Sequence, residues 1–411
     1  MKKRTLVITA AIWALALVAV MSSTLTLVAT GSVGAADGRS MTADELEMLD
    51  RYDRLEEVRR EIIENYYIDV DEDALVQGAI DGMLAALDDP YTFYYTVEDM
   101  EEQRESSFGE YKGVGMSVQM DGEGYITIVR VFSDSPAERA GIYAGDTLVA
   151  IDGDRLDIQT MKDLDEAVSR IRGEVDTDVV LTMLRNGEEL DFTVTRGDVT
   201  VNYIEYQMLG DAGYIHIYEF ERSTAADFKK AVDYFEDEGA SGIIIDLRNN
   251  PGGMLDSVIE ILDHLLPEGR VIYTEDRAGN VSSYYSDASH IDIPIVVMIN
   301  GESASASEIL AAAVQDYARG TLVGTTSFGK GIVQLLISFD DGAGMQFTES
   351  RYFTPEGRSI HGVGVDPDVV VEMDEDFDAS IKEVDPANDN QLEVALEELE
   401  KLIGADAAAA R

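Results

Sequence analysis

Residues 294–308 read PIVVMINGESASASE. The first seven residues form an apolar run that is typical of a buried strand, and a tight turn rich in serine and alanine follows it. A helix is expected from about Ala304 to Tyr317, and a further short strand at Thr321–Gly324. This order of strand, helix and strand predicts right-handed crossovers and a buried, largely parallel sheet.

The turn after Asn300 is the first candidate site. Ligands of open α/β sheets bind beyond the carboxyl ends of the strands, and Ser305 lies directly after such an end. Its small neighbours let a substrate backbone approach, so we interpret Ser305 as a nucleophile, as in a nucleophile elbow but without the GxSxG sequence. The alternative is that Ser303 or Ser305 only caps the following helix.

A lysine turn follows the strand Thr321–Gly324, which should return the chain to the level of Ser305. The segment TSFGKG covers residues 326–331. If this turn is buried, desolvation lowers the pKa of Lys330, and the neutral amine can accept the serine proton. Residues four apart in an extended run share a face, so Gln334 is expected to hold the lysine. The alternative is an ordinary surface lysine.

A third segment, SGIIIDLRNNPGG at residues 241–253, is an apolar strand followed by a glycine turn. Acyl transfer needs backbone N–H donors that point at the developing negative charge. The candidates for this oxyanion site are the amides of Gly252, Gly253 and Ala306. A histidine base is the competing arrangement, but neither His361 nor the other histidines follow a strand end with an acid nearby.

Residues 108–197 have a different pattern, in which short β-like runs alternate with glycine turns. Strands are expected at 115–119, 125–131, 147–151, 179–184 and 190–195, and helices at 135–140 and 160–172. The loop YKGVGMSV at 111–118 can hold a terminal carboxylate on its backbone N–H groups while a peptide adds a strand to the sheet edge. The candidate residues are Gly113, Val114, Gly115 and Met116. The apolar strand after this loop favours apolar C-terminal tails.

Helices are expected at both ends of the chain. Residues 41–107 have apolar residues near helical spacing and predict a helical arm. Residues 390–403 predict an amphipathic helix that packs on its own domain, with a dimer contact as the alternative.

The N-terminus predicts export. Lys2, Lys3 and Arg4 precede an uncharged run, 5–30, that is long enough to cross a bilayer. Positive residues stay on the cytoplasmic side, so the rest of the chain should be extracytoplasmic. The length of the run favours an uncleaved membrane anchor, whereas the small residues at 33–35 favour cleavage and secretion.

The composition excludes several functions. The chain has 31 Lys+Arg against 81 Asp+Glu, and the net charge of −50 disfavours binding to nucleic acid. This charge fits either simple solubility or adaptation to high salt. The absence of cysteine excludes thiol catalysis and cysteine–zinc sites, and the 4 histidines form no ligand pair. We therefore expect no metal and no cofactor.

These motifs together resemble those of the carboxyl-terminal processing, or tail-specific, peptidases, which are exported serine peptidases with an embedded PDZ domain. The resemblance covers about residues 50–400 and is carried by the segments 135–153, 246–253, 303–308, 328–334, 354–360 and 364–368. It implies an α/β peptidase core of the Clp-protease and crotonase type with an inserted PDZ domain and helical ends. It also implies that the PDZ domain gates the active site, and that the chain forms a homodimer.

The expected domains are a signal peptide or anchor (1–36), a helical arm (41–107), a PDZ domain (108–197), a peptidase core (198–375) and a helical tail (376–411). The expected function is a serine endopeptidase with a Ser/Lys dyad that cleaves exported proteins near their C-termini. One alternative is an inactive, membrane-tethered PDZ scaffold. Another is a crotonase-like acyl-CoA enzyme, which the export segment and the acidic surface disfavour because coenzyme A is anionic and cytosolic.

Overall fold

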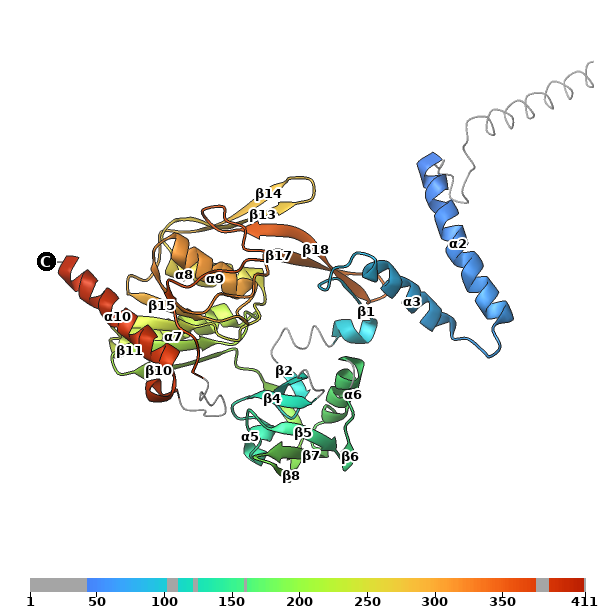
Figure 1. Ribbon diagram of the computed structural model, residues 1–411, viewed down its shortest axis with the longest axis horizontal. Helices are drawn as coiled ribbons and strands as arrows, with labels where there is room; N and C mark the ends of the chain where they lie inside the picture. Colours follow the sequence, from blue (N-terminus) through green and yellow to red (C-terminus); the bar gives the residue numbers. More distant parts are fainter. Residues whose placement is uncertain (1–42, 102–109, 121–124, 159–160, 375–383, 410–411) are drawn as a thin grey trace, which may run out of the picture. The chain divides into compact units, whose positions relative to one another are not determined.

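The computed structural model (Figure 1) describes residues 43–101, 110–120, 125–158, 161–374 and 384–409. The chain divides into two compact units, residues 1–88 and 89–411, and each is described by itself. The expected membrane segment, 5–30, lies outside the described residues. Among the residues that are described, no helix is both long and apolar enough to cross a membrane.

The described part of the first unit, residues 43–88, contains the helices α2 (Ala43–Asn65) and α3 (Glu72–Ala85). Asp71 is the N-cap of α3, because its carboxylate accepts the N–H groups of Asp73 at 3.0 Å and Ala74 at 3.2 Å. The helical arm expected over 41–107 does not continue as helix throughout. Residues 93–95, which belong to the second unit, form strand β1 instead, and β1 pairs with a strand of that same unit far along the chain.

A β-rich region begins the second unit. Its strands β3, β4, β5, β7 and β8 pair in this order, β6 pairs with β5, and β2 pairs with β9. Each expected strand and helix of this region is present, with ends shifted by at most two residues. The bounds are β2 Glu110–Gly113, β3 Met116–Met120, β4 Ile126–Val131, α5 Pro136–Ala140, β5 Thr147–Ile151, β6 Asp154–Arg155, α6 Met161–Ile171, β7 Asp178–Arg185, β8 Glu188–Thr195 and β9 Gly197–Thr200.

A six-stranded sheet forms the centre of the second unit, with the order β10, β11, β12, β15, β16, β19. All neighbours are parallel except β10 and β11, as the strand–helix–strand pattern predicts. The bounds are β10 Ile204–Leu209, β11 Ala212–Ile217, α7 Thr224–Glu238, β12 Gly242–Asp246, α8 Leu255–Leu265, β15 Ile295–Ile299, α9 Ala306–Asp316, β16 Gly320–Gly324, β19 Val369–Val370, a 3-10 helix Pro386–Asn388 and α10 Asn390–Ala409.

Helices cover both faces of this sheet (Figure 1). Alternate residues of a strand point to opposite faces. Ile243 and Ile245 of β12 are buried with α7, α8 and α9, whereas Ile244 is buried with Leu392 and Leu399 of α10. The C-terminal helix therefore packs on its own domain, as its apolar face predicts.

An antiparallel sheet accompanies the parallel one, and the sequence did not indicate it. Its strands follow the order β1, β18, β13, β14, and β17 also pairs with β18. The bounds are β1 Phe93–Tyr95, β13 Gly269–Asp276, β14 Val281–Ser286, β17 Ile332–Ser338 and β18 Gly344–Phe353. This sheet matters for the site because Lys330 lies two residues before β17 and Tyr352 lies on β18.

Candidate active site

Ser305 lies where β15 and its turn end and α9 begins. Its φ of 55° and ψ of −112° lie in a region that residues with a side chain rarely occupy. The turn is tight, because Ser303 N donates to Asn300 O at 2.9 Å and Asn300 N donates to Ser303 Oγ at 2.9 Å. A strained serine at a strand-to-helix turn is typical of a nucleophile.

The carboxylate of Glu308 joins the backbones of Ser305 and Lys330. Its Oε2 accepts the N–H of Ser305 at 2.9 Å and the N–H of Lys330 at 2.8 Å. Its Oε1 accepts the Ser327 hydroxyl at 2.6 Å and the N–H of Gly329 at 2.7 Å. Glu308 is fully buried, and these four donors use the four acceptor positions of an ionised carboxylate. The serine and glutamate three apart form a capping-box pattern, which is the sequence signal that could have revealed this residue.

The hydroxyl of Tyr352 joins the same two segments from the other side. It lies 2.7 Å from Lys330 O and 3.1 Å from Ser305 O, and it donates to this pair. The side chain is buried. Burial, together with the charge of Glu308, raises the pKa of Tyr352 well above its usual range, so the hydroxyl keeps its proton. No sequence signal pointed to Tyr352.

Lys330 is half-buried between two glycines. Its Nζ lies 4.3 Å from the centre of the Tyr91 ring, a cation–π distance. Burial lowers the pKa of Lys330, whereas the carboxylates of Asp89 and Glu308 oppose that shift. Within the described part of the chain, the backbones of Ser305 and Lys330 are joined, but no hydrogen bond links Lys330 Nζ to Ser305 Oγ.

Asp89 and Tyr91 were not recognised in the sequence, where they fall within the expected helical arm, 41–107. Asp89 accepts the N–H of Tyr91 at 3.0 Å and the hydroxyl of Thr92 at 2.7 Å. Burial alone would raise the pKa of Asp89. The two hydrogen bonds, a further one from Thr348 and the charge of Lys330 have the larger combined effect, so the pKa is lowered. The result is an ionised carboxylate close to the lysine.

Among the described residues, no hydrogen bond links Gln334 to Lys330. Its Nε2 donates to Thr348 Oγ1 at 3.4 Å, across the pairing of β17 with β18. A β-bulge between Val333 and Gln334 shifts the register there, and simple alternation along an extended run does not include such a shift. The role of Gln334 toward the lysine stays a prediction.

The expected oxyanion loop, defined here as residues 249–253, lies beside Ser305. A Cβ on Gly252 would lie 2.7 Å from Ser305 Cβ, and one on Gly253 would lie 2.3 Å from Phe220 O, so both positions exclude a side chain. Gly252 N donates to Asn250 Oδ1 at 2.9 Å. The Gly252 amide is therefore engaged, whereas Ala306 follows the nucleophile at the start of α9.

Asn250 connects this loop to the nucleophile turn. Its carbonyl accepts Ala304 N and Ser307 Oγ, each at 3.0 Å, and its side-chain amide donates to Ile217 O at 2.7 Å. Asn250 is fully buried. The loop and the turn therefore form one hydrogen-bonded body.

The candidate tail-binding loop lies between β2 and β3. Val114 O accepts Ala137 N at 2.7 Å, and Gly115 O accepts Phe132 N at 3.0 Å. Gly115 has a φ of 85°, and a Cβ there would lie 2.3 Å from Ser135 Cβ. Gly113 ends β2 and Met116 begins β3. Tail binding by this loop stays a prediction.

The histidine nearest to the lysine in the hydrogen-bond network is His361, whose Nδ1 accepts the N–H of Gly331 at 3.4 Å. Among the described residues, no histidine is hydrogen-bonded to Ser305. No group of three or more metal-ligating side chains is found in the described ranges.

Three family models match this chain. Residues 211–371 match peptidase family S41, residues 112–195 match a PDZ domain, and residues 15–99 match the N-terminal domain of the activating protease CtpB. The first match includes most of the parallel sheet together with Ser305 and Lys330. The second covers the sheet formed by β3 to β8.

Individual proteins are similar over most of the chain. The carboxy-terminal-processing protease of Bartonella bacilliformis is 38% identical over 324 residues, which cover 76% of this chain and 73% of that protein. The carboxyl-terminal-processing protease of Synechocystis sp. is 40% identical over 305 residues, with 72% and 70% covered. The solved structure of a photosystem II D1 C-terminal processing protease has a TM-score of 0.56 and 27% identity, and covers 85% of this chain and 96% of its own. These findings confirm the predicted fold class, a mixed α/β peptidase core with a PDZ domain and helical ends.

Proposed function

This chain belongs to peptidase family S41 and is a carboxy-terminal-processing serine protease, and from that premise we propose that Ser305 is its nucleophile and Lys330 its base. The observation that carries this proposal is the double connection between the two residues. Glu308 Oε2 accepts both backbone N–H groups, and the Tyr352 hydroxyl lies within hydrogen-bonding distance of both carbonyls. Two residues 25 positions apart are thus held in one fixed relation.

The reaction needs one proton to move and return. Neutral Lys330 takes the hydroxyl proton of Ser305 as Oγ attacks the scissile carbonyl carbon. The carbonyl oxygen becomes an oxyanion, which the amides of Gly253 and Ala306 stabilise. Collapse breaks the C–N bond, and the ammonium of Lys330 gives its proton to the leaving amine. Water then attacks the acyl-serine, with Lys330 again as the base, and releases the new carboxylate.

The half-buried environment of Lys330 supports its role as a base. Burial lowers its pKa, which increases the neutral fraction near pH 7. Asp89 and Glu308 act in the opposite direction and stabilise the ammonium that forms during the reaction. A catalytic base must come within hydrogen-bond reach of its proton, and such contacts often tighten only when substrate is bound. Lys330 Nζ therefore leaves the Tyr91 ring for Ser305 Oγ during turnover.

The PDZ domain supplies recognition of the substrate tail in this proposal. The loop containing Gly113 to Met116 holds the terminal carboxylate, and an apolar tail adds to β3. Gating is supported by Arg130 of β4, whose guanidinium lies 3.3 Å from the centre of the Tyr218 ring in the peptidase core. Two residues further along, Phe220 N donates to Gly252 O at 2.7 Å. Movement of the PDZ domain can thus reach the oxyanion loop.

Location and assembly complete the proposal. The uncharged segment 5–30 directs export and then either anchors the chain to the membrane or is removed. A homodimer forms through the helical arm, where Tyr52, Leu55 and Val58 of α2 are about half exposed at 53%, 47% and 49%. The net charge of −50 suits work at high salt.

The test uses the purified full-length chain in detergent, at low and high salt, with an unfolded reporter peptide that ends in an apolar tail. The peptide is supplied as the free acid and as the amide. We expect cleavage of the acid, weaker cleavage of the amide, and none by Ser305→Ala or Lys330→Ala. Equal cleavage of acid and amide would refute carboxylate recognition. Activity retained in either variant would refute the dyad, and tail binding without cleavage under any condition would favour the inactive scaffold.

A further inference from the structure

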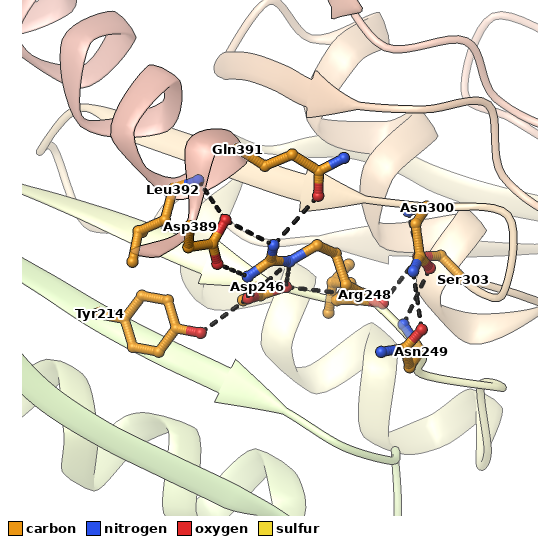
Figure 2. A network of polar contacts seen from close by, with 10 residues as sticks. Tyr214, Asp246, Arg248, Asn249, Asn300, Ser303, Asp389, Gln391 and Leu392 are labelled. Carbon is orange, nitrogen blue, oxygen red and sulfur yellow. Dashed lines mark hydrogen bonds and ion pairs between the residues drawn. The ribbon is translucent and has the colours of Figure 1, made fainter. Parts of the chain in front are cut away.

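A buried ion cluster connects the parallel sheet to the C-terminal helix (Figure 2). The guanidinium of Arg248 lies between Asp246, the last residue of β12, and Asp389, the residue before α10. Arg248 Nη2 donates to Asp246 Oδ2 at 2.6 Å and to Asp389 Oδ2 at 2.8 Å, and Nη1 donates to Asp389 Oδ1 at 3.1 Å. We call Asp246, Arg248, Asp389 and Gln391 the Arg248 cluster, since Gln391 Oε1 also accepts from Nη1 at 3.1 Å.

The cluster is almost closed to solvent. Asp246 is 0% exposed, Arg248 8% and Asp389 7%. Two carboxylates face one guanidinium, and the additional negative charge has two compensating partners. The Tyr214 hydroxyl donates to Asp246 Oδ2 at 2.7 Å, and Asp389 Oδ1 accepts Leu392 N at 2.9 Å at the positive end of α10. Every charged group is therefore paired, as burial requires.

Arg248 directly precedes the oxyanion loop, residues 249–253. Asn249 N donates to Asn300 Oδ1 at 3.0 Å, and Asn300 Nδ2 donates back to Asn249 Oδ1 at 2.8 Å. Ser303 Oγ donates to Leu247 O at 2.8 Å. The nucleophile turn thus holds the loop on one side, and the guanidinium of Arg248 holds it on the other (Figure 2). This guanidinium is bound by Asp389, which precedes α10 and lies 141 positions further along the chain.

We propose that Arg248 and Asp389 are positioning residues, through which helix α10 sets the place of the oxyanion loop beside Ser305. The proposal rests on the catalytic role proposed for Ser305. An ion pair suits this task because the planar guanidinium binds each carboxylate in a fixed direction, whereas apolar contacts allow sliding. Stability alone does not require it, since apolar residues can often replace a buried ion pair without loss.

The experiment compares two contacts between β12 and α10: the Arg248 cluster at the end of β12 and the packing of Leu399 at its start. Asp389→Asn keeps the size and the helix cap but places an amide against Arg248, and Asp389→Ser keeps the cap without reaching the guanidinium. Leu399→Ala is the matched control, because Leu399 is buried against Gly242 at the start of β12 and has no part in the cluster. All variants are made in the full-length chain and measured well below their unfolding temperatures.

Two readouts separate positioning from stability. We expect kcat for the reporter peptide to fall by about 10- to 100-fold in both Asp389 variants, with KM changed by less than about twofold, because misplaced oxyanion donors affect mainly the transition state. Backbone amides of 249–254 should exchange with deuterium faster in these variants. Leu399→Ala should unfold more easily yet keep kcat within about twofold.

Several results would overturn the proposal. One is a wild-type kcat together with wild-type deuterium exchange of residues 249–254 in both Asp389 variants. Another is a loss of kcat that is proportional to the loss of stability, with the same proportion in the Asp389 variants and in Leu399→Ala. A failure of the proposed function is recognised separately, by activity that survives Ser305→Ala. In that case the exchange of 249–254 still decides whether Asp389 holds the loop.

Discussion

Replacing Glu308 by glutamine should separate the charge of this residue from its geometry. The carboxylate accepts four donors, three backbone N–H groups and the Ser327 hydroxyl. In Glu308→Gln, the amide oxygen can still accept Ser305 N and Lys330 N, while the NH₂ group faces Ser327 Oγ and Gly329 N. The Ser327 hydroxyl, which also accepts Val365 N at 2.7 Å, can rotate and accept from the amide, so Gly329 N is the one backbone donor that loses its acceptor.

The expected cost in stability follows from this count. One buried N–H without a partner costs about 1–3 kcal/mol. Glu308→Gln should therefore lower the free energy of unfolding by about 1–3 kcal/mol, measured by chemical denaturation. Glu308→Ala leaves three N–H groups without acceptors and should cost at least about 3 kcal/mol, with loss of the fixed relation between Ser305 and Lys330.

The pH dependence should change in a defined direction. Lys330 must be neutral to act as a base, so kcat/KM rises with pH through the pKa of Lys330. Burial lowers this pKa, and the carboxylates of Asp89 and Glu308 raise it. The other groups around the lysine are the ring of Tyr91, the hydroxyl of Tyr352 and the imidazole of His361. Glutamine removes one of the two raising charges, so the acidic limb of the profile should move to lower pH.

The assay is kcat/KM of the reporter peptide across pH, with Glu302→Gln as the control. Glu302 lies in the same turn but is exposed, so water and salt screen its charge and the limb should stay in place. An acidic limb that is unchanged in Glu308→Gln, or moves to higher pH, would show that the reasoning about the lysine and its neighbour is wrong.

Three further predictions concern other buried groups. Tyr352→Phe removes the hydroxyl that lies between Ser305 O and Lys330 O. We expect kcat to fall about tenfold, the effect of about 1.4 kcal/mol, with little change in KM. Equal falls in kcat and in affinity for the substrate would contradict this expectation. Burial alone would raise the pKa of Asp246, but Arg248 and its other partners have the larger effect and lower the pKa to about 2. About 2 kcal/mol of stability should therefore be present above pH 4 and lost as pH falls toward 2. Denaturation curves of Asp246→Asn should show a weaker dependence over that range. Burial, and then repulsion from Glu219, raises the pKa of Glu221 from 4.5 to about 7, so the stability that this group contributes is present below about pH 4.5 and is lost as pH rises from there to about 7. Glu221→Gln should remove that decline, and an unchanged slope would argue against it.

The sequence predicted the parallel sheet well because its strands are continuous apolar runs. Residues 242–246 and 295–299 are buried on both faces, and such segments have few alternatives to a central strand. The turns after these strands could also be predicted, because serine and glycine at the end of a strand indicate a tight turn that a substrate can approach. This information was enough to place Ser305, Lys330 and the loop 249–253 at one edge.

The partners of these residues could not be predicted, because they depend on tertiary contacts. Tyr352 lies on β18, a strand of an antiparallel sheet whose residues do not form an apolar run. Asp389 meets Arg248 across a long separation in sequence. Gln334 follows a β-bulge that changes its direction, and Asn250 takes the Gly252 amide by a local hydrogen bond. None of these contacts leaves a spacing that one sequence can reveal.

The position of α10 on the parallel sheet has a consequence for biosynthesis. Strands β11, β12, β15 and β16 leave the ribosome well before residues 390–409, so one face of the sheet has no cover while the chain is still growing. During that interval Arg248 also has no Asp389 beside it. A chain that ends before residue 389 therefore contains Ser305 and Lys330 but lacks both the cover of this sheet face and the partner of Arg248.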